Sequence, residues 1–171
     1  MTPSENYLKR LPSDIGGVSA DRIDCRNANR QKDVVLAYFL LRVTIGTNIF
    51  IHGLSRILAG PSHFADALVL AFQHAPLPSG LVRLFALILP CAESVVGLLV
   101  LIGVRTRLTL VAGSLLILTL TLGATLNQDW ESAGLQLIYA AVYASLLAFR
   151  HQNTLSIDAL LERNSFKGDR L

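Results

Sequence analysis

The amino-acid sequence predicts an all-α integral membrane protein built as a four-helix bundle. Its 171 residues are 52% hydrophobic and only 16% charged, whereas a water-soluble domain is typically about 25% charged. Such a chain has too few charges to cover a surface that faces water. Four apolar stretches are long enough to cross the roughly 30 Å hydrocarbon layer of a bilayer, which takes about 20 helical residues. These stretches lie near residues 35–58, 81–103, 107–127 and 133–150.

The third and fourth stretches are the plainest spans, because neither contains a charged residue. They read LTLVAGSLLILTLTLGATL and AGLQLIYAAVYASLLAF. Backbone groups inside lipid must be hydrogen-bonded within a helix or a closed barrel. These continuous runs lack the two-residue alternation of barrel strands. We therefore expect every span to be helical.

The connection of residues 59–80 predicts a short helix. Phe64, Leu68 and Phe72 recur every four residues after Pro61, and a proline at this place is typical of a helix start. The run is too short to cross the bilayer. We therefore expect an interfacial or re-entrant helix in the first outer connection rather than a fifth span.

Composition divides the chain into three parts. Residues 1–33 are mostly polar and are expected to form a cytoplasmic tail, residues 34–150 hold the four spans, and residues 151–171 form a second cytoplasmic tail. In this second tail the segment NTLSIDALLER predicts an amphipathic helix along the inner membrane surface.

The orientation follows from Lys and Arg beside the spans, because cytoplasmic loops carry an excess of these residues. Twelve of them fall on one side of the four spans, and the connection of residues 59–80 on the other side has none. The twelve are Lys9, Arg10, Arg22, Arg26, Arg30, Lys32, Arg105, Arg107, Arg150, Arg163, Lys167 and Arg170. Both termini are expected in the cytoplasm, and the protein is expected in a plasma membrane of the bacterial type.

The net charge of +3 does not indicate a nucleic-acid partner, because the basic residues lie beside apolar runs rather than in one patch. The two cysteines, Cys25 and Cys91, form neither a CxxC motif nor part of a metal-type cluster. The sequence therefore predicts no metal site and no covalently bound cofactor.

Polar side chains recur on one face of several spans. Residues advance by about 100° along a helix, so the polar residues of the first span fall within an arc of roughly 120°. The residues that these faces offer to a ligand are Arg42, Asn48, His52 and Arg56 on the first span, Arg83 and Glu93 on the second, and Tyr139 on the fourth. A charge inside a bilayer is costly and normally faces the bundle interior with a partner.

Glu93 is the most informative of these residues. If the first two spans are antiparallel with matched midpoints, Glu93 lies near the level of Gly46, and Arg42 lies about one turn, roughly 6 Å, away. We therefore expect Arg42 to reach Glu93. Two interpretations stay open: Glu93 is a proton acceptor or hydrogen-bond partner for a bound quinone or other small ligand, or its ion pair with Arg42 only fixes the helix register.

The same alignment brings Arg56 and Arg83 to one level near the outer interface, with His52 about one turn deeper. This predicts a cationic mouth above the buried carboxylate of Glu93. His52 can donate a hydrogen bond to a ligand, carry protons near neutral pH, or simply bond a neighbouring helix. The two arginines can bind an anion or extend to lipid phosphates.

Four glycines of the spans predict close contacts between helices, because the absence of a side chain lets two backbones approach. They are Gly46, Gly53, Gly97 and Gly113.

With these residues placed, the chain resembles the DoxX family of small four-pass membrane proteins, from about Leu41 to Leu161. The resemblance is carried by LLRVTIGTNIFIHGLSRILAG, by the Glu93 helix that continues into GLLVLIGVRTRL, and by LSIDALL. The motif positions that match are Arg42, His52, Gly53, Arg56, Glu93, Gly97 and Arg107. Arg56 stands where a lysine is common, and Val96 stands where many members have a second glycine.

The resemblance implies a function, because some relatives are subunits of thiosulfate:quinone oxidoreductase and others are linked to redox complexes. It favours a redox-associated subunit that holds a quinone or a small anion in an outward-facing pocket. Glu93 and His52 are the candidate catalytic residues, which would handle protons, and the other polar residues of the three faces would bind the ligand. Electrons would come from a redox partner subunit, since no flavin, haem or iron–sulfur motif is visible in the sequence.

The alternative is a non-catalytic membrane scaffold or assembly factor whose buried charges only specify packing. The sequence alone leaves it open whether the chain is an enzyme, and a second copy of the chain is a further partner that it allows. The bilayer itself is the one partner that the composition requires.

Overall fold

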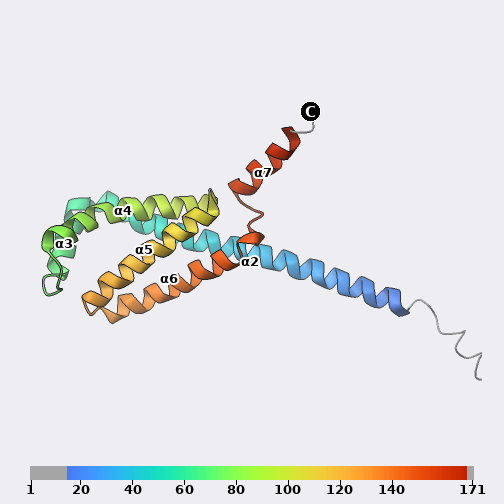
Figure 1. Ribbon diagram of the computed structural model, residues 1–171, viewed down its shortest axis with the longest axis horizontal. Helices are drawn as coiled ribbons and strands as arrows, with labels where there is room; N and C mark the ends of the chain where they lie inside the picture. The colour runs from blue at the N-terminus through green and yellow to red at the C-terminus, as the bar shows by residue number, and fades with distance from the viewer. Residues whose placement is uncertain (1–14, 169–171) are drawn as a thin grey trace, which may run out of the picture.

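The computed structural model describes residues 15–168, and the regular elements in this range are all helices. Figure 1 shows them in chain order. They are α2 (Ile15–Ala59), α3 (Pro61–Ala71), α4 (Ser79–Ile102), α5 (Thr106–Leu126), α6 (Trp130–Ala148), the 3-10 turn η1 (Arg150–Gln152) and α7 (Ile157–Gly168).

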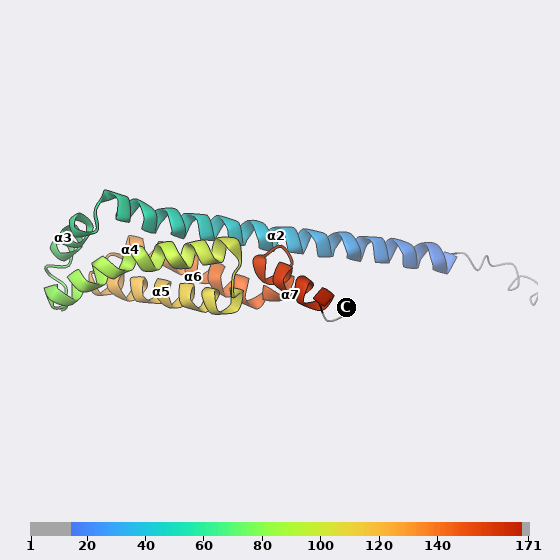
Figure 2. The same ribbon diagram turned by 90° about the horizontal axis from the view of Figure 1, so that it is seen from above.

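Four long helices, α2, α4, α5 and α6, run up and down beside one another (Figures 1 and 2). α2 packs most extensively against α4, α5 packs against α6, and α4 joins the two pairs through α5. α3 lies against α4 at one end of the bundle, which we call the α3 end, and η1 and α7 follow α6 at the other, the α7 end. The predicted all-α bundle is confirmed.

Three of the helices are long and apolar enough to cross a membrane: α2 from Arg26 onward, α4 and α5. At 1.5 Å per residue, the 24 residues of α4 and 21 of α5 reach about 36 and 32 Å, which matches the hydrocarbon layer. α6 is not among the three, because Glu131, Gln136 and its tyrosines lower its mean hydropathy. Its 19 residues lie along α5 over a similar length, so a fourth crossing remains a prediction that this packing supports.

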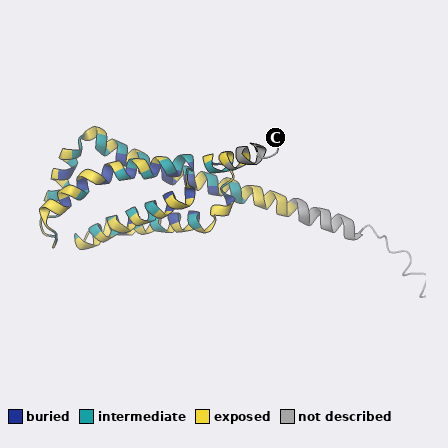
Figure 3. Cartoon of the chain, turned by 45° about the horizontal axis from the view of Figure 1, so that its top comes forward, coloured by how far each residue is buried: buried dark blue, intermediate teal, exposed yellow. Residues whose placement is uncertain are grey.

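Large apolar side chains cover the outside of the bundle. Figure 3 shows that exposed positions run along all four long helices. Leu84 is 56% exposed, Leu115 57% and Ile138 59%. A monomer in water rarely exposes so continuous an apolar surface, whereas a surface of this kind is matched to lipid. The described side chains thus support the membrane class that the composition predicts.

The first long helix begins well before the apolar stretch of residues 35–58. The structure continues α2 through the polar N-terminal part from Ile15, so that α2 has 45 residues and extends well past the α7 end of the bundle (Figure 2). Residues 18–33 contain neither glycine nor proline, and adding turns to a helix that is already formed costs far less than starting a new one. Residues 1–14 lie outside the described residues.

The predicted helix of the first connection is confirmed as α3, with Pro61 in its first turn. Gly60 turns the chain sharply between α2 and α3 with a φ of 99°, a conformation that glycine adopts readily because it has no Cβ. The buried Ala65 then packs α3 onto α4. C-terminally, NTLSIDALLER is helical only from Ile157 onward.

The predicted close contacts of the glycines are confirmed, and those of α2 and α4 fix the register of the pair. A Cβ added to Gly46 would lie 2.7 Å from the backbone nitrogen of Leu101, and one added to Gly53 would lie 2.6 Å from the carbonyl oxygen of Pro90. Gly97 meets the backbone of Phe50 equally closely. At these points one backbone rests directly on the other, so neither helix can slide along its partner.

We predict that Gly53→Ala lowers the free energy of unfolding by about 1–3 kcal/mol, because the added methyl group overpacks a backbone contact. Gly134→Ala is the matched control: it also places alanine in a helix, but no atom lies within 4 Å of the new Cβ. The control should be neutral or stabilising by up to about 1 kcal/mol, since alanine favours helix more than glycine does. Unfolding followed by circular dichroism in detergent measures both, and equal stability of the two variants would contradict the packing role of Gly53.

Candidate functional site

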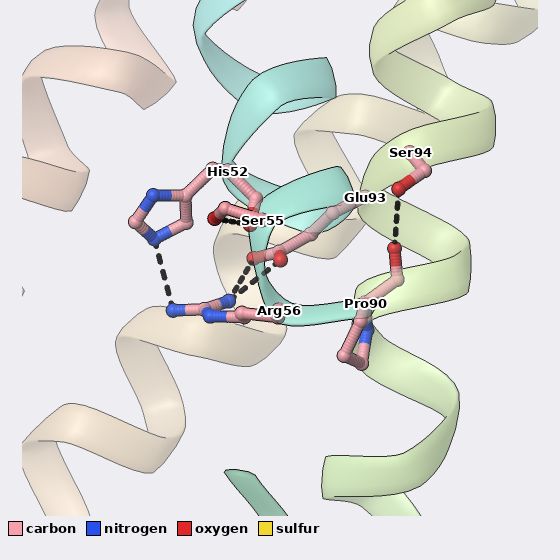
Figure 4. A network of polar contacts seen from close by, with 6 residues as sticks. All are labelled: His52, Ser55, Arg56, Pro90, Glu93 and Ser94. Carbon is pink, nitrogen blue, oxygen red and sulfur yellow. Dashed lines mark hydrogen bonds and ion pairs between the residues drawn. The ribbon is translucent and has the colours of Figure 1, made fainter. Parts of the chain in front are cut away.

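An ion pair between α2 and α4 is the centre of the candidate site (Figure 4). Nη1 of Arg56 donates to both carboxylate oxygens of Glu93, at 2.7 and 2.6 Å. The Glu93 side chain is 2% exposed and that of Arg56 is 24% exposed. Because removing one partner leaves an uncompensated buried charge, breaking such a pair typically costs about 3–5 kcal/mol.

The backbone around the pair explains why the two side chains meet. Gly53 brings α2 against α4 next to Pro90 and Ser94, and Glu93 lies between these two positions in the sequence. Side chains on a helix lean toward its N-terminus, so Arg56 reaches back to the level of Gly53. Its guanidinium also lies 4.5 Å from the centre of the Phe64 ring of α3. This cation–π contact covers the guanidinium on the side that faces α3.

His52 adds a titratable group to the pair. Its Nε2 lies 2.9 Å from Nη2 of Arg56, and in Figure 4 the ring stands beside the guanidinium. An arginine can only donate, so Nε2 accepts and the proton of the neutral ring is on Nδ1. The residue is exposed, which leaves this Nδ1–H available to a hydrogen-bond acceptor.

Asn48 and Tyr139 connect the same face of α2 to α6. The amide nitrogen of Asn48 donates to the hydroxyl group of Tyr139 at 3.0 Å. Asn48, His52 and Arg56 follow at intervals of four residues, so they form one polar stripe along α2. The predicted polar face of the first span is therefore present, and it meets the fourth predicted span as well as the second. We call these three residues the α2 stripe.

The expectation that Arg42 reaches Glu93 is wrong. The glycine contacts place Glu93 opposite residues 53–54 rather than Gly46, a difference of about eight residues or roughly 12 Å. Matched midpoints were the wrong assumption, because the first turns of α4 pack on α3, beyond the end of α2. Arg42 is consequently opposite the turn that follows α4.

The predicted cationic mouth is also wrong. Nη1 of Arg83 donates to the carboxylate of Asp66 on α3 at 2.6 Å. Both side chains are at least half exposed, at 50% and 63%, and within the described part of the chain Arg83 makes no hydrogen bond to His52, Arg56 or Glu93. Because α3 supplies this carboxylate, Arg83 is neutralised locally and does not join Arg56.

Arg42 belongs to a second polar cluster, at the α7 end. It is 2% exposed, and its Nη2 donates to the carbonyl oxygen of Leu155 at 2.6 Å. The guanidinium lies against Gly103, whose φ of 71° and lack of a Cβ make room for it. Arg42 thus attaches the C-terminal segment to the turn between α4 and α5.

Asp158 completes the second cluster by capping the start of α5. Its carboxylate accepts from the backbone N–H groups of Arg105 and Thr106, at 2.8 and 2.7 Å, and from the Thr106 hydroxyl group at 2.8 Å. Asn153 also donates to the Thr106 hydroxyl group at 2.8 Å. Although partial burial opposes ionisation, the three hydrogen bonds hold the pKa of Asp158 below its ordinary value.

The roles of Asp158, Asn153 and Thr106 were missed from the sequence. The signal was available in LSIDALL, where a single carboxylate stands among apolar residues, but its partner is a helix start about 50 residues earlier. Periodicity within either segment cannot reveal that pairing. Among the described residues, no group of three or more His, Cys, Asp or Glu could hold a metal ion.

The sequence is similar to one known protein family. The sequence profile of the DoxX family matches residues 37–128, more than half of the chain, from the middle of α2 to the end of α5. The chain belongs to the DoxX family. Neither the curated proteins nor the solved structures gave a match.

As a DoxX protein with three helices suited to crossing a membrane, the chain is a multi-pass membrane protein. The matched range contains the Arg56–Glu93 pair, the α2 stripe and Arg42. It ends before Tyr139 and Asp158, so these partners of the two clusters lie outside it.

We predict strong energetic coupling between Arg56 and Glu93 in a double-mutant cycle of Arg56→Met and Glu93→Gln. Each single variant leaves an unbalanced group in the interior, so the coupling should reach about 2 kcal/mol or more. The same cycle on the exposed pair, with Arg83→Met and Asp66→Asn, should give less than about 1 kcal/mol. Free energies of unfolding in detergent measure both cycles, and equal coupling of the two pairs would disprove the special role of the buried one.

We predict that Asp158 makes the protein less stable in acid. Its pKa is lowered in the folded chain, so its stabilising effect is present above the unfolded value of about 3.9 and is lost as the pH falls through the folded pKa. Asp158→Asn should lower the melting temperature at neutral pH and differ little from the wild type in acid. A difference between the two proteins that does not shrink as the pH falls would rule out the ionised cap.

Proposed function

We propose that this DoxX protein is a membrane subunit of a redox system and binds the head group of a quinone beside the α2 stripe. The observation that supports the proposal most is the exposure of Asn48 and His52 within the apolar part of α2. Each of these side chains has one bonded partner and keeps a further N–H donor, and a donor that faces lipid without a partner is costly. A lipophilic ligand with hydrogen-bond acceptors would remove that cost.

The chemistry of the stripe suits a quinone. With Nε2 of His52 taken by Arg56, Nδ1–H can donate to one quinone carbonyl. Asn48 uses one amide hydrogen on Tyr139 and keeps a second. The aromatic ring of Tyr139 supplies a surface on which a flat head group can stack.

The ion pair favours a neutral ligand over a small anion. Arg56 and Glu93 cancel one another's charge at 2.6 Å, and Arg83 is paired with Asp66. The site therefore has little excess positive charge with which to attract an anion. Glu93 does not touch the ligand. It holds Arg56, which in turn holds His52, so Glu93 is a positioning residue. His52 is the candidate proton donor.

Reduction of a quinone to a quinol takes two electrons and two protons. The sequence contains no visible electron-carrying motif, so a partner subunit would deliver the electrons and His52 would pass protons to the reduced ring. The basic residues at the α7 end, among them Arg105, Arg107 and Arg150, support a cytoplasmic position for that end. The quinone site would then lie toward the outer half of a plasma membrane.

We predict saturable binding of decylubiquinone, a short-chain quinone, to the protein in nanodiscs, and a loss of at least about tenfold in affinity for His52→Ala, which corresponds to one hydrogen bond to the ligand. His63→Ala is the matched control, because His63 is an exposed histidine of α3 outside the stripe. Equilibrium retention of the quinone measures both. Equal affinities of the two variants, or no saturable binding by the wild type, would refute the site.

Glu93→Gln provides the test of positioning. If Glu93 orients Arg56 and through it His52, this variant should weaken binding while the folded state persists, and the pH dependence of binding should change. A folded Glu93→Gln variant with wild-type binding would remove Glu93 from the function.

The alternative, a non-catalytic scaffold or assembly factor, is favoured by the completeness of the ion pair. Both charges are satisfied inside one chain, with both carboxylate oxygens bonded by Arg56, so the pair needs no ligand. In this case, the Arg56–Glu93 coupling would be strong, quinone binding would be absent, and loss of the protein would reduce assembly of its membrane partners.

A further inference from the structure

A broad groove opens at the α7 end. Its lining shares no residue with the proposed quinone site. The groove has a volume of about 1470 Å³ and lies between the start of α5, the η1 turn and α7. Its lining includes four exposed arginines. They are Arg105, Arg107, Arg150 and Arg163.

The charge of this groove is unbalanced. Among the lining residues whose side chains the structure describes, Asp158 is the one carboxylate. Both of its oxygens are already bonded by the start of α5. Among the described side chains, Arg56 and Arg83 form ion pairs, whereas none of the four groove arginines does. The groove therefore offers several guanidinium groups to an external anion, and guanidinium groups suit phosphate oxygens.

The walls of the groove are fixed rather than loosely placed. Asp158 and Asn153 both bond Thr106, and Arg42 holds the intervening segment through the Leu155 carbonyl group. These contacts set α7 and η1 against the start of α5. A single space is consequently bordered by Arg105 just before α5, Arg107 in its first turn, Arg150 in η1 and Arg163 on α7.

The position of the groove decides what kind of phosphate it fits. Thr106 begins α5 and Ala148 ends α6, so the groove lies where the apolar helices end and the head groups of the bilayer begin. Two apolar lining residues, Leu108 and Val111, are 62% and 38% exposed and continue down α5 toward the hydrocarbon layer. A ligand that fills both the arginine-lined part and the apolar part of the groove has a phosphate at one end and an acyl chain at the other.

We propose that this groove binds an anionic phospholipid, with its phosphodiester on the arginines and an acyl chain along Leu108 and Val111. The binding is independent of the proposed quinone site, which lies toward the other end of α2. A bound lipid of this kind would also offset part of the positive charge of the groove and hold α7 to the membrane surface.

The test uses native mass spectrometry of the full-length protein in detergent with added phosphatidylglycerol or phosphatidylcholine. The wild type should prefer phosphatidylglycerol. Arg107→Gln with Arg150→Gln should reduce its affinity for this lipid at least about tenfold, since each basic residue near a membrane surface contributes about 1 kcal/mol. The matched control is Arg26→Gln with Arg30→Gln, which removes two exposed charges of α2 that do not line the groove, and it should change the affinity less than about twofold.

Three results would overturn the proposal. If the groove variant and the control lost equal affinity for phosphatidylglycerol, the lipid would be attracted by the general surface charge and not by the groove. Equal binding of phosphatidylcholine would exclude an anion site. Displacement of phosphatidylglycerol by low millimolar inorganic phosphate would assign the arginines to a soluble phosphate rather than to a lipid. Circular dichroism checks that both variants are folded, and if the double variant unfolds, Arg150→Gln alone should still give a severalfold loss.

Discussion

The burial of one carboxylate is the constraint on which the rest of the bundle depends. Glu93 is 1% exposed in the middle of α4, where an unpaired charge would cost several kcal/mol. The charge of Arg56 balances it only if α2 and α4 keep one register, and Gly53 and Gly97 enforce that register by backbone contact. The polar stripe, the position of α3 and the separation of the two polar clusters all follow from this one alignment.

The sequence predicts the helices well because apolar length and proline or glycine punctuation are local signals. It cannot predict register, since sliding α4 by two turns along α2 leaves both hydrophobic patterns intact. The register depends on three glycines, Gly46, Gly53 and Gly97. The sequence predicts that each one makes a close helix contact, but it does not show which residue of the partner helix lies opposite each glycine. With that pairing, Arg56 rather than Arg42 would have been matched to Glu93. The shared face of Asn48 and His52 is predictable because it depends only on spacing within one helix. Their role in a site stays a prediction, to which the structure adds the hydrogen bond from Asn48 to Tyr139.

α3 explains the remaining difference at its end of the bundle. α4 begins beyond the last turn of α2, and α3 packs there with Ala65 fully buried. A short helix in a connection is thus part of the wall beside the site: Asp66 takes up the charge of Arg83 and Phe64 covers the guanidinium of Arg56. Its role could not be derived from its amphipathic pattern alone, which predicts that it lies at an interface but not which charges it meets.

The two arginines of α2 give the two ends of the protein different electrical characters. Arg56 has a full counter-charge in Glu93, whereas Arg42 bonds one carbonyl oxygen and its Nε and Nη1 have no hydrogen-bond partner within the described part of the chain. The ionised Asp158 lies near enough to act on Arg42, but its oxygens are bonded to α5. The α3 end is therefore locally neutral, which suits an uncharged ligand that arrives through lipid. The α7 end keeps an excess of positive charge, which suits the anionic surface of a membrane. One chain thereby combines a basic α7 end with a neutral buried ion pair toward the α3 end, and the difference between Arg42 and Arg56 results from which partner each arginine finds.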